Sequence, residues 1–163
     1  MSSDKLSHLD DQGNAQMVDV GNKADTHREA VVQGRIRMKP KTLALIESGQ
    51  TKKGDVLTVA KVAAIQGAKK TSDLIPMCHP IPIVGVEVRF EFDPELPGIH
   101  IHIKVRSTGK TGVEMEALTA ASIGLLTIYD MAKAVDQGML IEHIGLLEKS
   151  GGKSGPWTRT EVA

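Results

Sequence analysis

Two alternating apolar runs, separated by a short turn, constrain the fold of this chain most. Apolar residues occupy every second position from Val84 to Phe92, and again from Ile99 to Val105. A period of two is typical of strands with one buried face. The segment 93–98 between the runs contains two prolines and a glycine, which favour a reversal of the chain. The sequence therefore predicts an antiparallel hairpin.

Two longer segments have the apolar periodicity of helices. Residues 56–69 follow Asp55, a suitable N-cap, and are rich in alanine with a wide apolar face. The longest predicted helix runs from Val113 to Val135 and ends before Gly138. Shorter elements are predicted as a strand at 30–38, a helix at 41–48 and a strand at 139–147. This order predicts an α+β fold, in which an antiparallel sheet carries the two larger helices on one face.

The length of the chain indicates a single domain. A chain of 163 residues can bury one substantial core, and a second full domain is not expected. The polar residues 1–16 are predicted to form a flexible N-terminal arm, residues 17–155 the domain and residues 156–163 a C-terminal tail. The glycine-rich segment 149–155 is expected to be a flexible loop.

Charge and cysteine content narrow the partners and the compartment. The 20 basic and 20 acidic residues cancel, so the overall charge indicates neither a nucleic acid nor a membrane as partner. The N-terminal residues lack an apolar signal segment, and no apolar run approaches the length of a membrane span. Cys78 is the only cysteine, which fits a reducing compartment. The protein is therefore expected in the cytoplasm.

Two short motifs look like nucleotide phosphate loops but fail on spacing. Gly-Lys-Thr stands at 109–111 and Gly-Lys-Ser at 152–154. A Walker loop needs a further glycine five residues before the first of these, because the chain must wrap its amides around the phosphates. Lys104 and Leu147 occupy those positions, so no nucleotide-hydrolysing loop is predicted. Lys110 stays open to two readings, a solvated turn residue or an anion ligand beside a helix N-terminus.

A metal site is the first alternative for the remaining polar residues. Cys78 and His79 lie in a proline-punctuated loop, and a metal would have to recruit histidines at 100, 102 and 143. The chain has one thiol and no pair of ligands at zinc-site spacing, so no metal site is predicted. His100 and His102 are expected on the solvent face of their strand, because the isoleucines at 99, 101 and 103 carry the apolar face.

The long helix carries acidic residues near both ends. Asp130 and Lys133 are spaced to pair on its surface, either as an exposed ion pair or as an acid/base pair in a partly dry site. Glu114 and Glu116 open the helix, where the helix dipole alone explains them. On an ideal helix Glu116 and Asp130 lie within roughly 40° of each other but about 21 Å apart along the axis. If both act on one small substrate, they belong to different subunits, unless the substrate is long.

A series of motifs runs in order through nearly the whole chain after the N-terminal arm. They are Met17–Val20, Arg28–Ala30, Lys53–Asp55, Asp73–Pro80, Thr108–Ala120, Tyr129–Lys133 and Lys149–Gly155. Together they resemble the molybdenum cofactor biosynthesis protein C family of cyclic pyranopterin monophosphate synthases. The resemblance implies a ferredoxin-like fold and a hexamer of three dimers with active sites at the dimer interfaces. It also implies conversion of 3′,8-cyclo-7,8-dihydroguanosine triphosphate into cyclic pyranopterin monophosphate, with release of pyrophosphate.

The resemblance also assigns roles to individual residues. Asp130 and Lys133 match the catalytic acid/base positions, and Lys53 is the third catalytic candidate. The substrate-binding positions, followed by polar positions around the same pocket, are Met77, Cys78, His79, Met115 and Glu116, then Glu114, Arg28, Lys69, Lys149 and Lys153. No metal ligand and no cofactor is implied in the protein itself, and Mg²⁺ could accompany the triphosphate.

Two points qualify this reading of the sequence. Met77 stands where the family pattern has leucine, a change that keeps a similar apolar volume. A catalytically silent, oligomeric nucleotide-binding or regulatory protein on the same fold is the alternative function. The joint presence of Lys53, Asp130 and Lys133 argues against it, because a silent homologue has no reason to keep all three.

Overall fold

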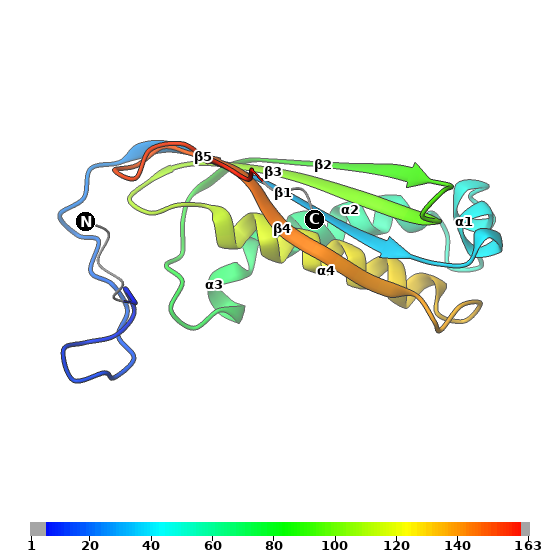
Figure 1. Cartoon of the computed structure of the whole chain (residues 1–163), viewed down its shortest axis with the longest axis horizontal. Helices are drawn as coiled ribbons and strands as arrows, with labels where there is room; N and C mark the ends of the chain where they lie inside the picture. Colours follow the sequence, from blue (N-terminus) through cyan, green and yellow to red (C-terminus); the bar gives the residue numbers. More distant parts are fainter. Residues whose placement is uncertain (1–5, 161–163) are drawn as a thin grey trace.

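One five-stranded antiparallel sheet and four helices make up the computed structural model, which describes residues 6–160. The strands lie side by side in the order β2-β3-β1-β4-β5 (Figure 1). In chain order the elements are β1 (Thr26–Arg37), α1 (Pro40–Glu47), α2 (Val56–Lys69), α3 (Thr71–Leu74), β2 (Ile83–Asp93), β3 (Gly98–Gly109), α4 (Glu114–Ala132), β4 (Leu140–Ser150) and β5 (Trp157–Thr158).

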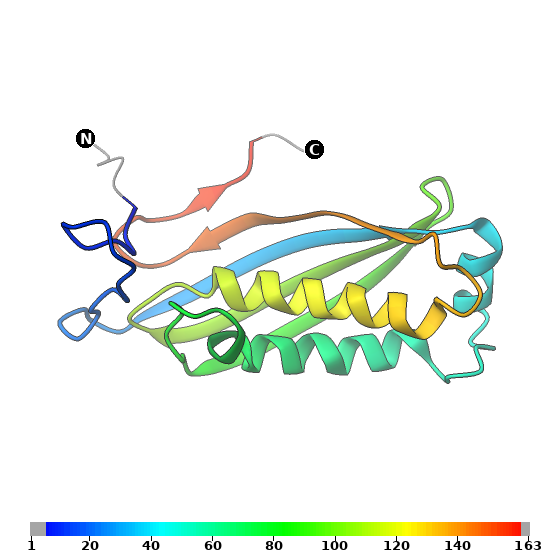
Figure 2. The ribbon, with the colours of Figure 1, turned by 90° about the horizontal axis from the view of Figure 1, so that it is seen from below.

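The two larger helices cover one face of the sheet, as predicted. α2 and α4 lie side by side, run in opposite directions and stand in front of the strands in Figure 2. The strand order β4-β1-β3-β2, with helices between β1 and β2 and between β3 and β4, is the ferredoxin-like arrangement. In the described part of the chain no helix lies on the opposite face, which is called the open face below (Figure 1).

The predicted hairpin fixes which side chains enter the core. β2 pairs with β3 in a register that places Val88 opposite Ile103. Alternate β3 side chains, such as those of Ile101 and Ile103, are at most 1% exposed and pack toward α4. Gly124 of α4 lies directly above Ile101, because a Cβ added there would come within 2.6 Å of the Ile101 Cδ1 atom. The missing side chain lets α4 approach the sheet closely.

Element boundaries differ from the predictions where tertiary pairing overrides local pattern. β1 begins at Thr26, four residues before its apolar alternation, because it continues to pair with β3 as far as Gly109. α4 ends at Ala132 instead of residue 135. Four residues after Ala132, the buried Asp136 carboxylate accepts hydrogen bonds from the Lys39 amide and the Thr42 hydroxyl, which ties the chain to the start of α1.

The two ends of the chain also contain structure that the sequence did not predict. β4 continues through Ser150 and pairs with the short strand β5, so part of the expected loop and tail is strand. In the predicted arm, the Asp10 carboxylate accepts the backbone amides of Gln12 and Asn14 and closes a turn. Residues 1–5 of that arm and 161–163 of the predicted tail lie outside the described residues. Among the helices that the structure describes, none has the length and apolar character needed to cross a bilayer.

Candidate functional site

The three predicted catalytic residues meet at one end of the helical layer. Lys53 lies in the turn before α2, and Asp130 lies in the last turn of the antiparallel neighbour α4. The Lys53 Nζ atom donates to the Asp130 carbonyl oxygen at 3.0 Å and lies 3.6 Å from the Asp130 carboxylate. Lys133 donates to the same carboxylate at 2.5 Å. These three residues are named the Lys53 cluster.

The Lys53 cluster behaves electrostatically as an exposed ion triplet. The hydrogen bond and charge of Lys133, together with the charge of Lys53, hold the pKa of Asp130 below its usual value. Asp130 in turn raises the pKa of Lys133. All three side chains are about half exposed, from 48% to 59%, so the single chain does not supply the partly dry environment that acid/base chemistry favours.

The predicted substrate-binding residues line a pocket at the opposite end of α4. Its walls come from the loop after α3, from the first turn of α4 and from the N-terminal segment, and it encloses about 380 Å³. This Cys78 pocket is lined by the predicted residues Met77, Cys78, His79, Glu114, Met115 and Glu116. The stiff Pro-containing loop and the helix start therefore bring two separate sequence motifs together.

Glu116 is the unusual carboxyl group of the Cys78 pocket, because only 4% of the residue is exposed. Burial raises its pKa to about 7, and the negative charge of Glu114 adds to the shift. Burial and the charge of Glu116 also raise the pKa of the Cys78 thiol. The helix dipole is therefore an incomplete explanation for Glu116, which can hold a proton near neutral pH and release it within the pocket.

Most of the predicted cations gather around the same end. Lys149 on β4 lies 3.2 Å from the Glu114 carboxylate, and it also donates to the Ser154 hydroxyl. Arg28 on β1 donates to the Gly109 carbonyl oxygen at 3.1 Å. Lys69, at the end of α2, lines a shallow neighbouring pocket that also contacts Glu116. Lys153 is exposed in the turn between β4 and β5, which lies at this end of the molecule (Figure 2).

The N-terminal segment contributes to the Cys78 pocket, which sequence reasoning missed. His8, Val18, Val20 and Lys23 line it. The Lys110 ammonium donates to the Gly21 carbonyl oxygen at 2.7 Å and holds this segment in place. In the single chain Lys110 is thus a backbone anchor. The sequence did hold a signal for the role of this segment at the pocket, because the first motif of the family resemblance is Met17–Val20.

The histidines considered for a metal lie elsewhere. His100 and His102 are on the open face of the sheet, as predicted, and their rings pair with Asp93 and Glu91 respectively. Residues 6–160 contain no group of three or more histidine, cysteine, aspartate or glutamate side chains suited to holding a metal ion. Cys78 and His79 line the Cys78 pocket, to which His100, His102 and His143 do not contribute.

The two groups of residues are too far apart to act together within one chain. Glu116 and Asp130 are 14 residues apart on α4, which corresponds to about 21 Å along the helix axis. Both residues lie on the unbroken helix α4, but their surroundings differ, because Glu116 is buried and Asp130 is exposed. The Cys78 loop and the N-terminal segment line the pocket around Glu116, whereas the Asp130 side chain is exposed and contacts Lys53 and Lys133.

A Glu116→Gln variant is expected to flatten the pH dependence of stability. Between pH 4.5 and about 7 the folded chain keeps a proton on Glu116 that the unfolded chain loses. Stability therefore falls as the pH rises through this window, by about 2–3 kcal/mol for this group. Urea unfolding of both proteins at several pH values from 5 to about 8 measures the difference. Parallel curves for the two proteins would contradict the raised pKa.

A comparison with known protein families identifies the family of this chain. The model of the MoaC family matches residues 17–152, a span that includes the Lys53 cluster and most of the Cys78 pocket. The match begins at the segment that closes the pocket and ends in the turn after β4. The chain therefore belongs to the MoaC family, which acts in molybdenum cofactor biosynthesis.

Proposed function

We propose that this protein is a cyclic pyranopterin monophosphate synthase, a lyase that acts on 3′,8-cyclo-7,8-dihydroguanosine triphosphate and releases pyrophosphate. One observation carries the proposal for this chain. The residues assigned to catalysis and to substrate binding form two groups, the Lys53 cluster and the Cys78 pocket, at opposite ends of one helix. An enzyme of this kind would use both groups.

The separation of the two groups supports an active site shared between two chains. In a symmetric dimer the Lys53 cluster of one chain can face the Cys78 pocket of the other, and the arrangement repeats at the second site. Covering the exposed ion triplet would also strengthen its electrostatics by removing water. We propose that three such dimers form a hexamer in the cytoplasm, with no nucleic acid or membrane as partner.

The charges around the Cys78 pocket fit a triphosphate substrate. Arg28, Lys69, Lys149 and Lys153 would neutralise the phosphates and the charge that develops as one phosphate cyclises and pyrophosphate leaves. Such a cluster of preorganised cations is the main electrostatic requirement of phosphoryl chemistry. Mg²⁺ would enter with the triphosphate as part of the substrate.

The carboxyl and ammonium groups would then move protons during formation of the pterin ring. Glu116, with a pKa of about 7, can donate a proton at neutral pH and take it back. In the Lys53 cluster, Lys53 donates to the Asp130 carbonyl oxygen and Lys133 donates to the Asp130 carboxylate. Once desolvated by a second chain, these groups would exchange protons with a substrate placed between the two ends.

The direct test is anaerobic incubation of the purified protein with 3′,8-cyclo-7,8-dihydroguanosine triphosphate. We expect release of pyrophosphate and formation of a product that gives an oxidised pterin after workup. Tight binding of the triphosphate without pyrophosphate release would instead identify a catalytically silent binding protein. Absence of both binding and release would contradict any role at this step.

Mixed oligomers test whether the two ends come from different chains. Lys53→Ala damages one end and His79→Ala the other, so each homogeneous variant is expected to be inactive. A mixed dimer contains one site with both defects and one intact site. Random association of equal amounts should therefore restore about a quarter of wild-type activity. Differently tagged, co-expressed chains provide the sample, and no recovery in verified mixed oligomers would place both ends of each site in one chain.

A further inference from the structure

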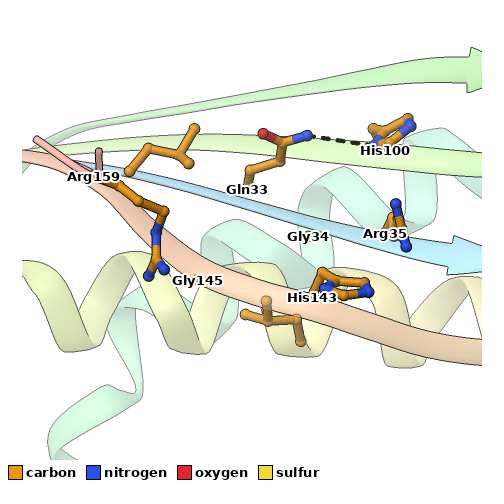
Figure 3. Close-up of a pocket in the computed structure, with 9 residues that line it drawn as sticks. Gln33, Gly34, Arg35, His100, His143, Gly145 and Arg159 are labelled. Carbon is orange, nitrogen blue, oxygen red and sulfur yellow. Dashed lines mark hydrogen bonds between the residues drawn. The ribbon is translucent and has the colours of Figure 1, made fainter. Parts of the chain in front are cut away.

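A second pocket lies on the open face of the sheet, away from both groups described above. It encloses about 220 Å³ between β1, β3, β4 and the residue that follows β5. It is named the sheet-face pocket. Its polar lining consists of Gln33, Arg35, His100, His143 and Arg159, with Gly145 between the last two (Figure 3). None of these residues was assigned a role in the synthase reaction.

A bulge in β4 forms one wall of the sheet-face pocket. Gln33 of β1 pairs with Gly145, and Arg35 pairs with Glu142, so two residues of β4 stand opposite Gly34. The first of them, His143, has a φ of 56° and is the only non-glycine residue with positive φ in the described chain. Bulges and left-handed residues are uncommon and often direct a side chain into a functional site. Here the bulge presents an imidazole to the pocket.

Arg159 is held in position before any ligand binds. Its backbone amide donates to the Leu147 carbonyl oxygen at 2.8 Å, and its Nε atom donates to the Leu146 carbonyl oxygen at 2.7 Å. The guanidinium group lies over Gly145, where an added Cβ would come within 3.1 Å of Nη2. The Trp157 ring lies 5.9 Å from its central carbon. The terminal nitrogens remain as preorganised donors.

The charges around the sheet-face pocket leave a positive surplus. Glu142 is shared between Arg35, at 3.0 Å, and Arg37, at 2.8 Å. Asp93 is engaged by the His100 ring at 2.9 Å. Within residues 6–160 no carboxylate lies in salt-bridge distance of Arg159. Among the described residues around the pocket, the guanidinium groups of Arg35, Arg37 and Arg159 therefore outnumber the carboxylates of Glu142 and Asp93. The imidazole of His143 adds a further donor.

We propose that the sheet-face pocket binds a phosphate group, either free phosphate or the phosphate of a monoester, with Arg159 and His143 as its principal ligands. A guanidinium group that is fixed in place and two nearby nitrogen donors match the charge and the oxygen geometry of such a group. The Gln33 amide and Arg35 form the opposite side of the pocket (Figure 3). The proposal does not depend on the synthase reaction.

Methyl NMR of the intact oligomer tests this proposal with inorganic phosphate as the probe. Ile144 lines the sheet-face pocket, and Ile81 lines the separate pocket beside Lys69 and Glu116. In protein labelled at the isoleucine δ1 methyl groups, phosphate should shift the Ile144 signal saturably, and chloride at equal ionic strength should not. Arg159→Gln should weaken this binding at least about tenfold, since it removes a charge-assisted contact.

Two further variants keep the test decisive. Arg89→Gln removes an exposed arginine elsewhere on the open face and should leave phosphate binding unchanged. Glycine suits the left-handed backbone at position 143, so the His143→Gly variant should fold normally. It should bind phosphate more weakly than the wild type, because it lacks the imidazole ligand. An Ile144 signal that never responds, a response retained in Arg159→Gln, or a shift confined to Ile81 would each overturn the proposal. A methyl monophosphate arm then separates free phosphate from a monoester as the preferred ligand.

Discussion

Replacing Lys53 by alanine is expected to reduce the rate of pyrophosphate release by about 10²–10⁴-fold, the usual contribution of a positioned acid or base. Lys53 contacts both the carbonyl oxygen and the carboxylate of Asp130, so its loss removes one cation and also frees the carboxylate on one side. The rate is measured anaerobically with saturating 3′,8-cyclo-7,8-dihydroguanosine triphosphate. Size-exclusion chromatography establishes that the variant keeps the oligomeric state of the wild type.

The neighbouring lysine supplies a matched control for this experiment. Lys52 is exposed in the same turn, and among the described residues it makes no ion pair with Asp130. Lys52→Ala changes the same charge at almost the same place and should keep nearly full activity. Equal losses in the two variants would indicate that the turn before α2 acts only through its net charge. Full activity of Lys53→Ala would remove Lys53 from the catalytic group.

Replacing Ile101 by alanine is expected to destabilise the fold by about 2–5 kcal/mol. Ile101 is fully buried. Its Cδ1 atom packs against Gly124 of α4, where the absence of a side chain leaves room for it. The truncation would leave a cavity between β3 and α4, because a close-packed layer relaxes only in part. Urea unfolding, with midpoint and slope fitted together, gives the change in the free energy of unfolding.

The adjacent residue is the control, because it points to the other face of the same strand. His102 is partly exposed, and its only ionic partner in the described chain is Glu91 at 3.6 Å. His102→Ala should change the free energy of unfolding by less than about 1 kcal/mol. Similar costs for the two substitutions would contradict the assignment of the open and covered faces of the sheet.

Local patterns in the sequence were sufficient to predict the larger helices and strands and the layers, but not the short elements α3 and β5. Alternation in the two hairpin strands and the alanine-rich stripe of residues 56–69 reflect which side of each element is buried. The spacing argument against a phosphate loop used only the sequence, and the structure agrees with it, because Lys104 lies within β3. The motifs behind the family resemblance are contiguous segments, so they too are visible in the sequence.

Features that depend on contacts between distant segments could not be predicted in this way. Lys53 and Asp130 are 77 positions apart and meet because α2 and α4 pack antiparallel. The sequence places Glu116 in the first turn of a helix, but its burial and raised pKa come from the Cys78 loop and the N-terminal segment that cover it. Arg159 lay in a segment read only as a tail.

The sequence by itself therefore determined the larger elements, the covered face of the sheet and the membership of a family, because each depends on residues close together along the chain. The tertiary structure decided how the functional residues divide between the two ends of α4, which carboxyl group is buried, and where the β4 bulge places His143. The physical reason is that burial, pKa and charge pairing depend on side chains from elements far apart in sequence, and only packing brings these together.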